Sequence, residues 1–430
     1  MAPVLGHSGW FDVVMPSRTL SSAGPSRILP PPGPARGLAA AQLVNSLGDG
    51  AFLVTSALYF SRVVGLPATR IGLGLTLAWA VGALAGVPLG QLADRRGPRT
   101  VAVLLATATG LSVGAFLFVR GFLPFVLAAC CYATAQTGLA AARQALLAAL
   151  VERRDRTHVL AHLQSTLNAG LAVGAAFGGV ALHYGTRTAY LAVFALDAAA
   201  FLLCALVLLR LPAVAPTAAL PGRGPRFAVL RDRPYALVTL LNTLLLLRMP
   251  LISLAIPLWT VTRTDAPGWL VSVLLVLNTG AVMLFQVRTA SAVRDLSSAR
   301  RTVARGGVLM LASCAVFALS AAGASAWVAV VVLLVAGGLQ VAGEMMQSAG
   351  AWQIGFDLAP ADQQGQYQGF FGMGVPLARM LGPLLLTALI VDWGVPGWLL
   401  LGALFLGAGL ALGPAVRWAE RVNSGTAAVG

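Results

Sequence analysis

Long apolar runs alternate with short polar loops along most of the chain. Each run is long enough for a helix that crosses a bilayer, which takes roughly 20 residues at about 1.5 Å of rise per residue. Twelve such runs cover approximately residues 39–61, 70–92, 100–119, 122–150, 159–183, 188–209, 235–261, 268–288, 303–322, 326–354, 366–391 and 396–416. The pattern therefore predicts an all-α polytopic membrane protein with twelve transmembrane helices.

The longest internal loop divides the twelve runs into six and six. Residues 211–233 contain four prolines and a basic cluster, which predicts a cytosolic linker between bundles at 39–210 and 234–418. A short stretch around Asn45 in the first run also resembles a stretch around Asn242 in the seventh. Two related halves are therefore expected.

The two ends of the chain lack such runs. Residues 1–38 are dominated by Pro, Gly, Ser and Arg and contain no apolar core of a secretory signal. We expect a disordered cytosolic N-terminal tail there, because this composition cannot bury a core, and a short cytosolic C-terminal tail at 419–430.

Composition agrees with a membrane protein. Of 430 residues, 58% are hydrophobic and 10% are charged, whereas soluble domains carry roughly 25% charged residues. The net charge of +15 comes from arginines in the short loops, which argues against a nucleic-acid partner. Counted by loop, 21 arginines flank one side of the runs and five flank the other. By the positive-inside rule both termini face the cytosol, and we expect a multi-pass protein of the plasma membrane.

No cofactor or metal is expected. His158 and His162 are spaced for a shared helix face but have no third ligand nearby, and the chain contains no P-loop sequence. The four cysteines lie within apolar runs and suggest no disulfide framework. No loop is large enough for a soluble catalytic domain, so an enzyme is not expected.

A dense cluster of charge, glycine and proline separates the second and third runs. Residues 90–100 read GQLADRRGPRT, and only a very tight turn fits there. The cluster resembles the motif G-x-L-A-D-R-x-G-R-R that joins the second and third helices of major facilitator superfamily transporters, with Pro98 where that family usually carries Arg. The matching residues include Gly90, Asp94, Arg95, Gly97 and Arg99.

The resemblance implies the major facilitator fold, in which two pseudo-symmetric six-helix bundles transport solutes by alternating access. It also implies a gate on the cytosolic side. Asp94 is expected against the N-terminal end of the eleventh helix, whose dipole favours a carboxylate. Arg95 or Arg99 is expected to pair with Glu152 or Asp155 in the loop after the fourth run.

The fifth run carries a second resemblance. Its glycines resemble the G-x-x-x-G-P-x-x-G-G run in the fifth helix of exporter-type members, with Ala175 in place of the proline. The matching residues are Gly170, Gly174, Gly178 and Gly179. The resemblance favours an exporter, whereas the alternative is that small residues serve only the close packing of two helices.

Charged residues inside the runs are the strongest functional candidates. A charge at the bilayer centre costs at least ~2.5–3.5 kcal/mol on insertion scales, which makes each such residue a functional-site hypothesis. Six qualify: Asp49, Arg143, Asp197, Arg248, Glu344 and Arg379. The resemblance places Asp49, Arg143, Arg248 and Glu344 on the four helices that line the family's central cavity.

Their depth along the helices predicts two pairs. Asp49 is expected to meet Arg143, and Arg248 is expected to meet Glu344, either as coupling sites or as static ion pairs between helices. Arg379 is expected to pair with one of the two acids or to face the cavity. Asp197 is expected to be a hydrogen-bond partner of a neighbouring helix.

Asp49 is the expected proton site. Burial favours its neutral form and a nearby arginine favours its charged form, so movement of the halves would bind and release a proton. Asn45, one turn earlier, is expected to share its hydrogen bonding. Acidic residues in the first helix of drug/proton antiporters are placed similarly, and Arg143 resembles the fourth-helix arginine of those members.

These features predict a secondary active transporter, a monomer in the lipid bilayer that exports a small amphipathic or hydrophobic compound in exchange for protons. One alternative is an uptake carrier or facilitator for a small polar nutrient, which would have more polar and aromatic residues in its cavity. A membrane scaffold or enzyme is a further alternative, but the sequence shows no catalytic cluster at one membrane face.

Overall fold

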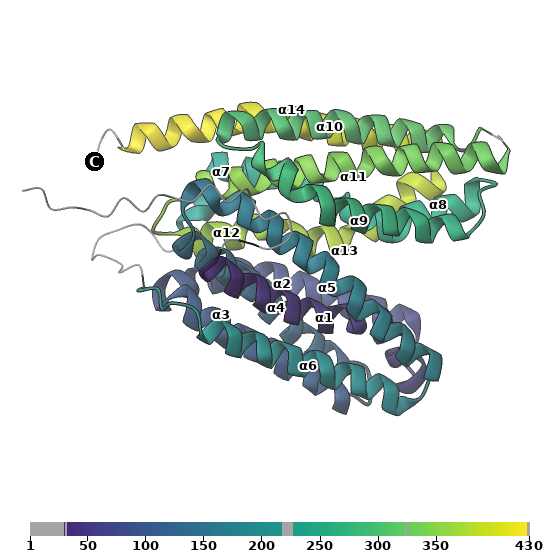
Figure 1. Ribbon diagram of the computed structural model, residues 1–430, viewed down its shortest axis with the longest axis horizontal. Coiled ribbons are helices and arrows are strands. Elements are labelled where there is room, and N and C mark those ends of the chain that lie inside the picture. Colours follow the sequence, from purple (N-terminus) through teal and green to yellow (C-terminus); the bar gives the residue numbers. More distant parts are fainter. Residues whose placement is uncertain (1–29, 31, 217–226, 323–324, 428–430) are drawn as a thin grey trace, which may run out of the picture.

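The protein is a bundle of long helices that run roughly in one direction and its reverse (Figure 1). The computed structural model describes residues 30, 32–216, 227–322 and 325–427. Most of the predicted N-terminal tail, part of the predicted linker and the last residues of the C-terminal tail lie outside the described residues.

The first six helices match the first six predicted runs in order. They are α1 (Pro34–Leu58) with a π turn (Tyr59–Val63), α2 (Ala68–Arg96), α3 (Pro98–Ala115) with a 3-10 turn (Phe116–Phe118), α4 (Phe122–Leu150), α5 (Arg156–Tyr184) after a 3-10 turn (Arg153–Asp155), and α6 (Arg187–Leu209).

The remaining runs form eight helices, because two runs are broken by proline and glycine. A 3-10 turn (Ala228–Arg231) precedes α7 (Arg233–Leu246), a π turn (Leu251–Ala255), α8 (Ile256–Arg263), α9 (Trp269–Ser291), α10 (Leu296–Leu319), α11 (Ala326–Asp357), α12 (Gln364–Gly372), α13 (Gly374–Leu386), a π turn (Thr387–Asp392) and α14 (Val395–Ala427). Pro250 lies just after the first break, directly before the π turn Leu251–Ala255, and Pro383 lies before the π turn Thr387–Asp392; a proline in a helix removes one backbone hydrogen bond.

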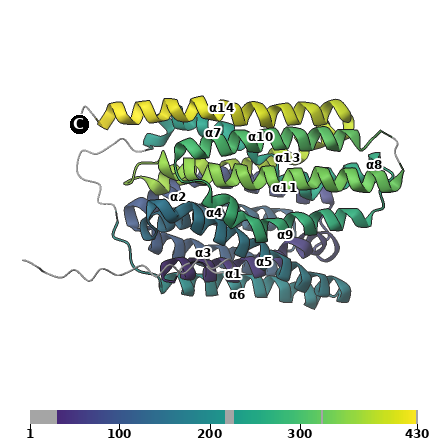
Figure 2. The ribbon, with the colours of Figure 1, turned by 45° about the horizontal axis from the view of Figure 1, so that its top comes forward.

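Eleven helical segments of the described part are long and apolar enough to cross a membrane. Helix α1 is not among them, because Gln42, Asn45 and Asp49 lower its hydropathy. With 25 residues and a five-residue π turn it falls within the range of 21–32 residues that the eleven segments cover. It packs along α5 and α6, both of which are among the eleven, and it corresponds to the first predicted run (Figure 2).

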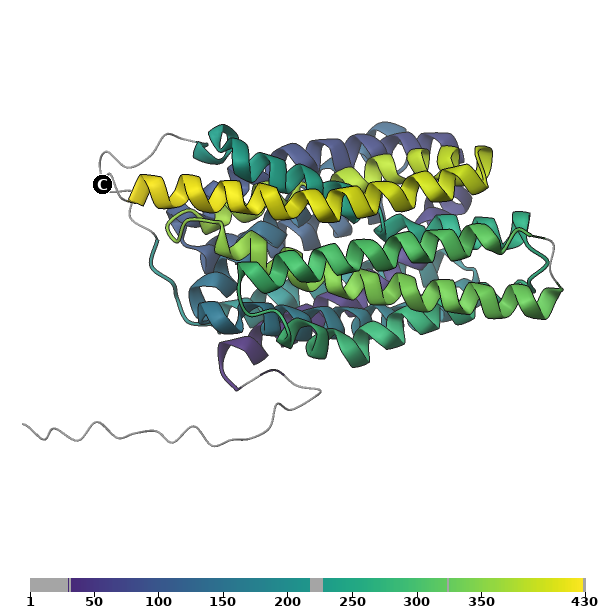
Figure 3. The ribbon, with the colours of Figure 1, turned by 90° about the horizontal axis from the view of Figure 1, so that it is seen from above.

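Each half has an apolar core, and each core also includes one or two residues of the other half. One core joins residues of α1–α6 and contains an aromatic cluster around Phe60, Phe116 and Phe194. The other joins residues of α7–α14, where the Trp398 ring stacks on Phe317 with centroids 4.8 Å apart. Helix α14 runs along the outside of this second half against α10 (Figure 3).

The loops rich in arginine gather at the end of the molecule where the described chain finishes, which we call the arginine-rich end. The two halves lie together there and diverge towards the opposite end (Figure 1). Several charges predicted in loops lie in terminal helical turns instead, because long side chains reach water from there. Helix α2 continues through Asp94 and Arg96, and α10 already includes Arg300.

A single glycine connects α2 and α3. Gly97 has a φ of 90°, a conformation that side chains with a Cβ rarely adopt. Pro98 follows at the first position of α3, where its missing N–H leaves no helical bond unmade. The predicted tight turn is therefore one residue long.

Three of the four predicted glycines on α5 face α1. A Cβ on Gly174 would overlap the Leu47 carbonyl oxygen and lie 3.0 Å from the Gly50 Cα, and Gly170 and Gly178 are similarly close to α1. A Cβ on Gly179, in contrast, would have no neighbouring atom within 4 Å. The two helices therefore approach along one strip of small residues.

We expect Gly174→Ala to destabilise the protein by ~1–3 kcal/mol, because an extra methyl group in a fully packed contact forces the helices apart. Thermal unfolding in detergent measures the loss. Gly179→Ala is the matched control and should leave the unfolding temperature unchanged or slightly raised, since alanine favours the helix. Equal effects of both changes would contradict the packing role of Gly174.

Candidate functional site

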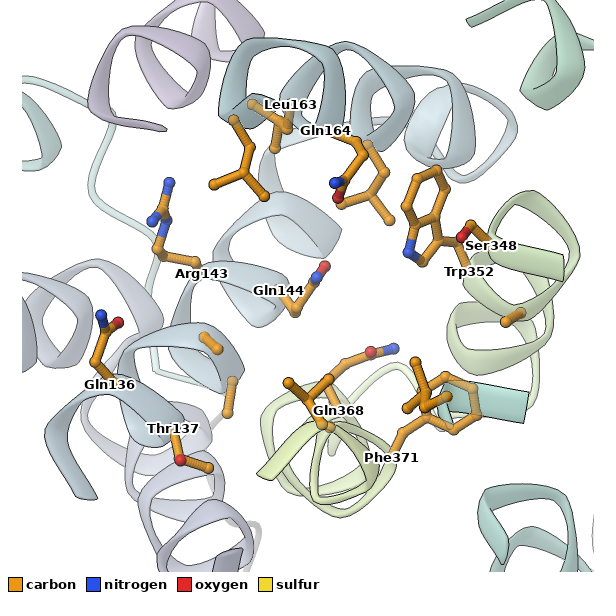
Figure 4. A pocket seen from close by; sticks show the side chains of 18 of the residues that line it. Gln136, Thr137, Arg143, Gln144, Leu163, Gln164, Ser348, Trp352, Gln368 and Phe371 are labelled. Carbon is orange, nitrogen blue, oxygen red and sulfur yellow. The ribbon is translucent and has the colours of Figure 1, made fainter. Parts of the chain in front are cut away.

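A cavity of about 410 Å³ lies between the two halves. Residues of α1, α2, α4, α5 and α7 line it, together with residues of α11, α12 and α13. Gln144, Gln164 and Gln368 come from three different helices and point into the same space, and Trp352 lies at its side (Figure 4). Polar groups from both halves therefore converge on one volume.

Asp49 lines this cavity and is held by neutral donors. Its carboxylate accepts hydrogen bonds from Asn45 Nδ2 at 2.8 Å and from the Tyr132 hydroxyl at 3.4 Å. Gln136 Nε2 donates in turn to the Tyr132 oxygen at 3.0 Å. Spacings of four residues place Asn45 with Asp49, and Tyr132 with Gln136, on facing sides of α1 and α4.

The expected ion pair between Asp49 and Arg143 is not formed. Arg143 donates instead to Gln42 Oε1 at 2.5 Å. Gln42 lies two turns before Asp49 on the same face of α1. The Arg143 side chain binds Gln42 and therefore does not extend to the Asp49 carboxylate. Arg143 does line the cavity, as expected for the fourth run.

The second expected pair is absent as well. Arg248 donates to Ser348 Oγ at 2.7 Å and to the Leu245 carbonyl at 3.2 Å. Glu344 accepts from Asn278 Nδ2 at 3.0 Å and from Gln340 Nε2 at 3.1 Å. Ser348 lies one turn beyond Glu344 on α11, so the pairing prediction was wrong by one helical turn. Arg248 lines the cavity and Glu344 does not.

Arg379 faces the cavity from α13 and reaches the other half. Its guanidinium lies over the Trp79 ring of α2, 4.6 Å from the ring centre. A cation over an aromatic face is attracted by the ring quadrupole. The contact replaces the ion pair with Asp49 or Glu344 that was the alternative.

Asp197 on α6 is fully buried against α1. A Cβ on Gly48 would overlap its carboxylate. Neither carboxylate oxygen has a hydrogen-bond partner among the described residues, so the expected bond to a neighbouring helix is not formed.

Asp94 ties the two halves together at the arginine-rich end. Its carboxylate accepts the backbone N–H groups of Gly365 at 2.6 Å and Gln366 at 2.8 Å. These residues open α12, the first part of the eleventh predicted run, and the positive end of that helix favours a carboxylate. The structure therefore places Asp94 where the sequence analysis expected it.

Glycines let α2 and α12 approach closely beside Asp94. A Cβ on Gly90 would overlap the Gly365 carbonyl oxygen, and one on Gly86 would lie 2.7 Å from the Gly369 oxygen. No side chain separates the two backbones at these points.

The basic residues of the predicted gate have other partners than expected. Arg99 donates to the carbonyl oxygens of Leu211 at 2.8 Å and Leu209 at 3.4 Å. These carbonyls belong to the C-terminal end of α6, which attracts cations. Glu152 and Asp155 both lie beside Arg154 in their own turn, and Arg95 is exposed. The predicted pairing of Arg95 or Arg99 with these two acids was wrong.

A different ion pair closes the same end. Arg153 Nε lies 2.7 Å from Asp357 Oδ1, and Thr157 donates to Gln353 Oε1 at 2.5 Å. Gln353 Nε2 donates to Asp357 at 2.7 Å, so the contacts form one network between α5 and α11. The loop after the fourth run thus pairs with the end of the tenth run.

Several residues of the cavity and of the Asp49 hydrogen-bond network were not predicted from the sequence. Tyr132 is four residues before Gln136 on the face that carries Arg143, so helical spacing from Arg143 would have found it. Gln42 would follow from Asn45 and Asp49 in the same way. Trp79 and Trp352 give no such signal, because aromatic residues are common in apolar helices.

Comparison with known proteins gives one family. A model of the Major Facilitator Superfamily matches residues 38–383. Among curated proteins, no sequence matches the chain.

Several solved structures share the fold at low sequence identity. The human organic anion transporter MFSD10 is 16% identical, with a TM-score of 0.69 over 89% of this chain and 100% of that one. A bacterial homologue of the iron transporter ferroportin, in its outward-facing state, is 13% identical with a TM-score of 0.72 over 90% and 99%. The fucose:proton symporter FucP of E. coli is 14% identical with a TM-score of 0.68 over 90% and 98%.

Proposed function

The chain belongs to the Major Facilitator Superfamily, and on that premise we propose that it exports a small amphipathic or hydrophobic compound in exchange for protons. Family membership makes it a transporter of small molecules across a lipid bilayer and not an enzyme. Direction, proton coupling and the kind of compound are our proposal. We also propose that it acts as a monomer in the plasma membrane with both termini in the cytosol.

One observation carries the proposal most directly. An acidic residue, Asp49, lies halfway along a membrane crossing and lines the cavity between the halves. Its partners are neutral, so the cost of keeping it charged is not offset by an ion pair. A carboxyl group in that situation can bind and release a proton when its surroundings change.

Movement of the halves would supply that change. Arg143 and Arg379 both line the cavity with Asp49 and come from different halves. An arginine that approaches Asp49 favours the carboxylate, and one that withdraws favours the neutral acid. Alternating access would therefore couple the position of the halves to the protonation of Asp49.

The contacts at the arginine-rich end also support a cycle of alternating access. Asp94 and the Arg153–Asp357 pair hold the arginine-rich end closed, and the halves diverge at the other end. If the arginine-rich end faces the cytosol, as the arginine count predicts, this is an outward-facing conformation. Breaking a few such contacts is enough to reach the opposite state, because the two states need differ by only a few kcal/mol.

A polar-nutrient carrier is the second candidate, and the cavity itself favours it. Such a carrier is expected to have many amide and aromatic residues there. The lining includes the amides Gln42, Gln136, Gln144, Gln164 and Gln368. The names of the similar structures point to an organic anion, iron and fucose, so the shared fold does not single out one kind of substrate.

Transport into proteoliposomes distinguishes the two candidates. We expect an acidic vesicle interior to drive accumulation of an amphipathic compound, because protons leave as the compound enters. A proton symporter would instead need an acidic exterior. The panel should contain neutral compounds and permanently charged cations and anions, since weak acids and bases distribute passively with pH.

Protein-free liposomes and a protonophore are the controls. Accumulation that does not depend on the pH gradient would contradict proton exchange and favour a facilitator. Accumulation of polar sugars driven by an acidic exterior would replace the export proposal by the uptake proposal.

A further inference from the structure

Three arginines line the cavity, and none of them forms an ion pair with an acid in the described part of the chain. Arg143, Arg248 and Arg379 line it from α4, from the turn after α7 and from α13. Among the described residues, no ion pair joins any of them to an acid. Their partners are the Gln42 amide oxygen, the Ser348 hydroxyl and the Trp79 ring.

An arginine held only by neutral groups is incompletely compensated. Removing a charge from water is costly unless an opposite charge and hydrogen bonds replace the water. Arg248 shows this most clearly, because it is buried and its Nε has no hydrogen-bond partner among the described residues. A negatively charged acceptor would both satisfy this N–H group and compensate the buried charge.

The acids nearby do not supply that acceptor. Asp49 is the one carboxylate among the lining residues and already accepts from Asn45 and Tyr132. Glu344 lies outside the lining and accepts from α9 and from its own helix. Asp197 is buried between α6 and α1 and does not line the cavity, so with Asp49 and Glu344 counted against the three arginines the site keeps one net positive charge.

Apolar side chains form part of the remaining lining. Leu163, Leu246, Trp352 and Phe371 contribute to it beside the amides. A volume of about 410 Å³ lies within the usual range of roughly 300–1,000 Å³ for sites that take drug-sized ligands. The site thus combines a positive region with an apolar wall.

We propose that the transported compound is an organic anion whose carboxylate or sulfonate binds among Arg143, Arg248 and Arg379, and whose apolar body lies against Trp352 and Phe371. The proposal rests on the proposed function, since it takes this cavity to be the transport site. Arginine suits this role because its planar group donates two parallel hydrogen bonds to such an anion.

The proposal has an electrical consequence. Export of a monovalent anion against entry of one proton moves two positive charges inward per cycle. Transport would then depend steeply on the membrane potential, because each charge moved across the membrane is driven by it. Export of a neutral compound against one proton would move only one.

Binding to the purified full-length protein in detergent tests the charge preference. The probes are 2-naphthalenesulfonate, 2-naphthoate, 2-naphthylmethylammonium and 2-naphthalenemethanol, which share one ring system, and equilibrium dialysis measures their affinities. We expect the two anions to bind at least ~10-fold more tightly than the alcohol or the cation, as one charged hydrogen-bonded contact gives.

Arginine variants locate the site. Arg248→Gln and Arg379→Gln should each weaken sulfonate binding by ~10-fold or more and leave binding of the alcohol nearly unchanged. Arg300→Gln is the matched control, because Arg300 pairs with Glu420 at 2.9 Å far from the cavity. It should bind both probes like the wild type.

Several results would overturn the proposal. They are tighter binding of the cation or the alcohol, binding of neither anion, and unchanged sulfonate affinity in the arginine variants. If Arg248→Gln does not fold, Arg379→Gln decides the question, since that side chain is exposed. Binding in detergent needs no proton gradient, so it can be measured independently of transport. Anion binding that depends on the arginines, together with transport that no proton gradient drives, would contradict the export proposal but not the proposed anion site.

Discussion

Replacing Asp49 by asparagine is expected to abolish proton-driven accumulation while exchange of substrate across the membrane continues. The change keeps the size of the side chain and its bond to Asn45 but removes the group that binds a proton. A pH gradient of about 1.7 units supplies ~2.3 kcal/mol per proton, which sustains roughly a fifty-fold gradient of a neutral solute. Asp49→Asn should therefore reduce accumulation from tens of fold to none in the proteoliposome assay.

Asp265→Asn is the matched control, because Asp265 is an exposed acid in the loop between α8 and α9. It should accumulate substrate like the wild type. If Asp49→Asn accumulated substrate to the same level as this control, Asp49 would have no part in proton coupling.

Replacing Asp94 by alanine is expected to open the arginine-rich end. The change leaves two N–H groups at the start of α12 without their charged acceptor. Hydrogen bonds to a charged group contribute ~1.5–3 kcal/mol, so the equilibrium between the closed and open forms of that end should shift roughly 10–150-fold. Spin labels on Arg96→Cys and Ala361→Cys, in a background without the four native cysteines, report the distance between the halves.

Asp155→Ala is the control for this experiment. Asp155 lies at the same end but pairs with Arg154 in its own turn, 3.8 Å away. The control should keep the short distance, and Asp94→Asn should give an intermediate population because its amide oxygen still accepts a hydrogen bond. An unchanged distance in Asp94→Ala would show that Asp94 does not hold the halves together.

The fold follows from the sequence because hydropathy and arginine placement act over whole helices. All predicted runs correspond to helices, and the family resemblance of residues 90–100 agrees with the family model. The sequence did not predict that the seventh and eleventh runs are interrupted. Proline allows a helix to break but does not require it, and neighbouring helices decide.

The contacts of the site were harder to predict. Distance along a helix gives the depth of a charge but not the direction in which its side chain points. Asp49 and Arg143 have similar depth, yet Gln42 takes the arginine. In the same way, Arg248 binds Ser348, which lies one turn beyond Glu344 on α11. Neutral amides and hydroxyls compete well for arginine in a membrane and carry no sequence signal of their own.

The predicted gate contains one contact that was predicted correctly and others that were not. Asp94 was placed correctly, since a carboxylate and a helix N-terminus attract each other whatever the other side chains do. The partners of the basic residues were not predicted correctly, because a long, flexible arginine side chain can bind any of several nearby acceptors. Arg153 binds Asp357 of the other half, and Arg99 donates to the carbonyls at the end of α6.

The crossing of α2 and α12 has a kinetic consequence. Gly86 and Gly90 meet Gly365 and Gly369 through backbone atoms alone. A contact of this kind has no interlocking side chains that must change rotamer or slide past each other before the surfaces separate. We therefore expect little friction when this end of the molecule opens, so that the speed of turnover is set by the few polar bonds that must break and hardly at all by repacking.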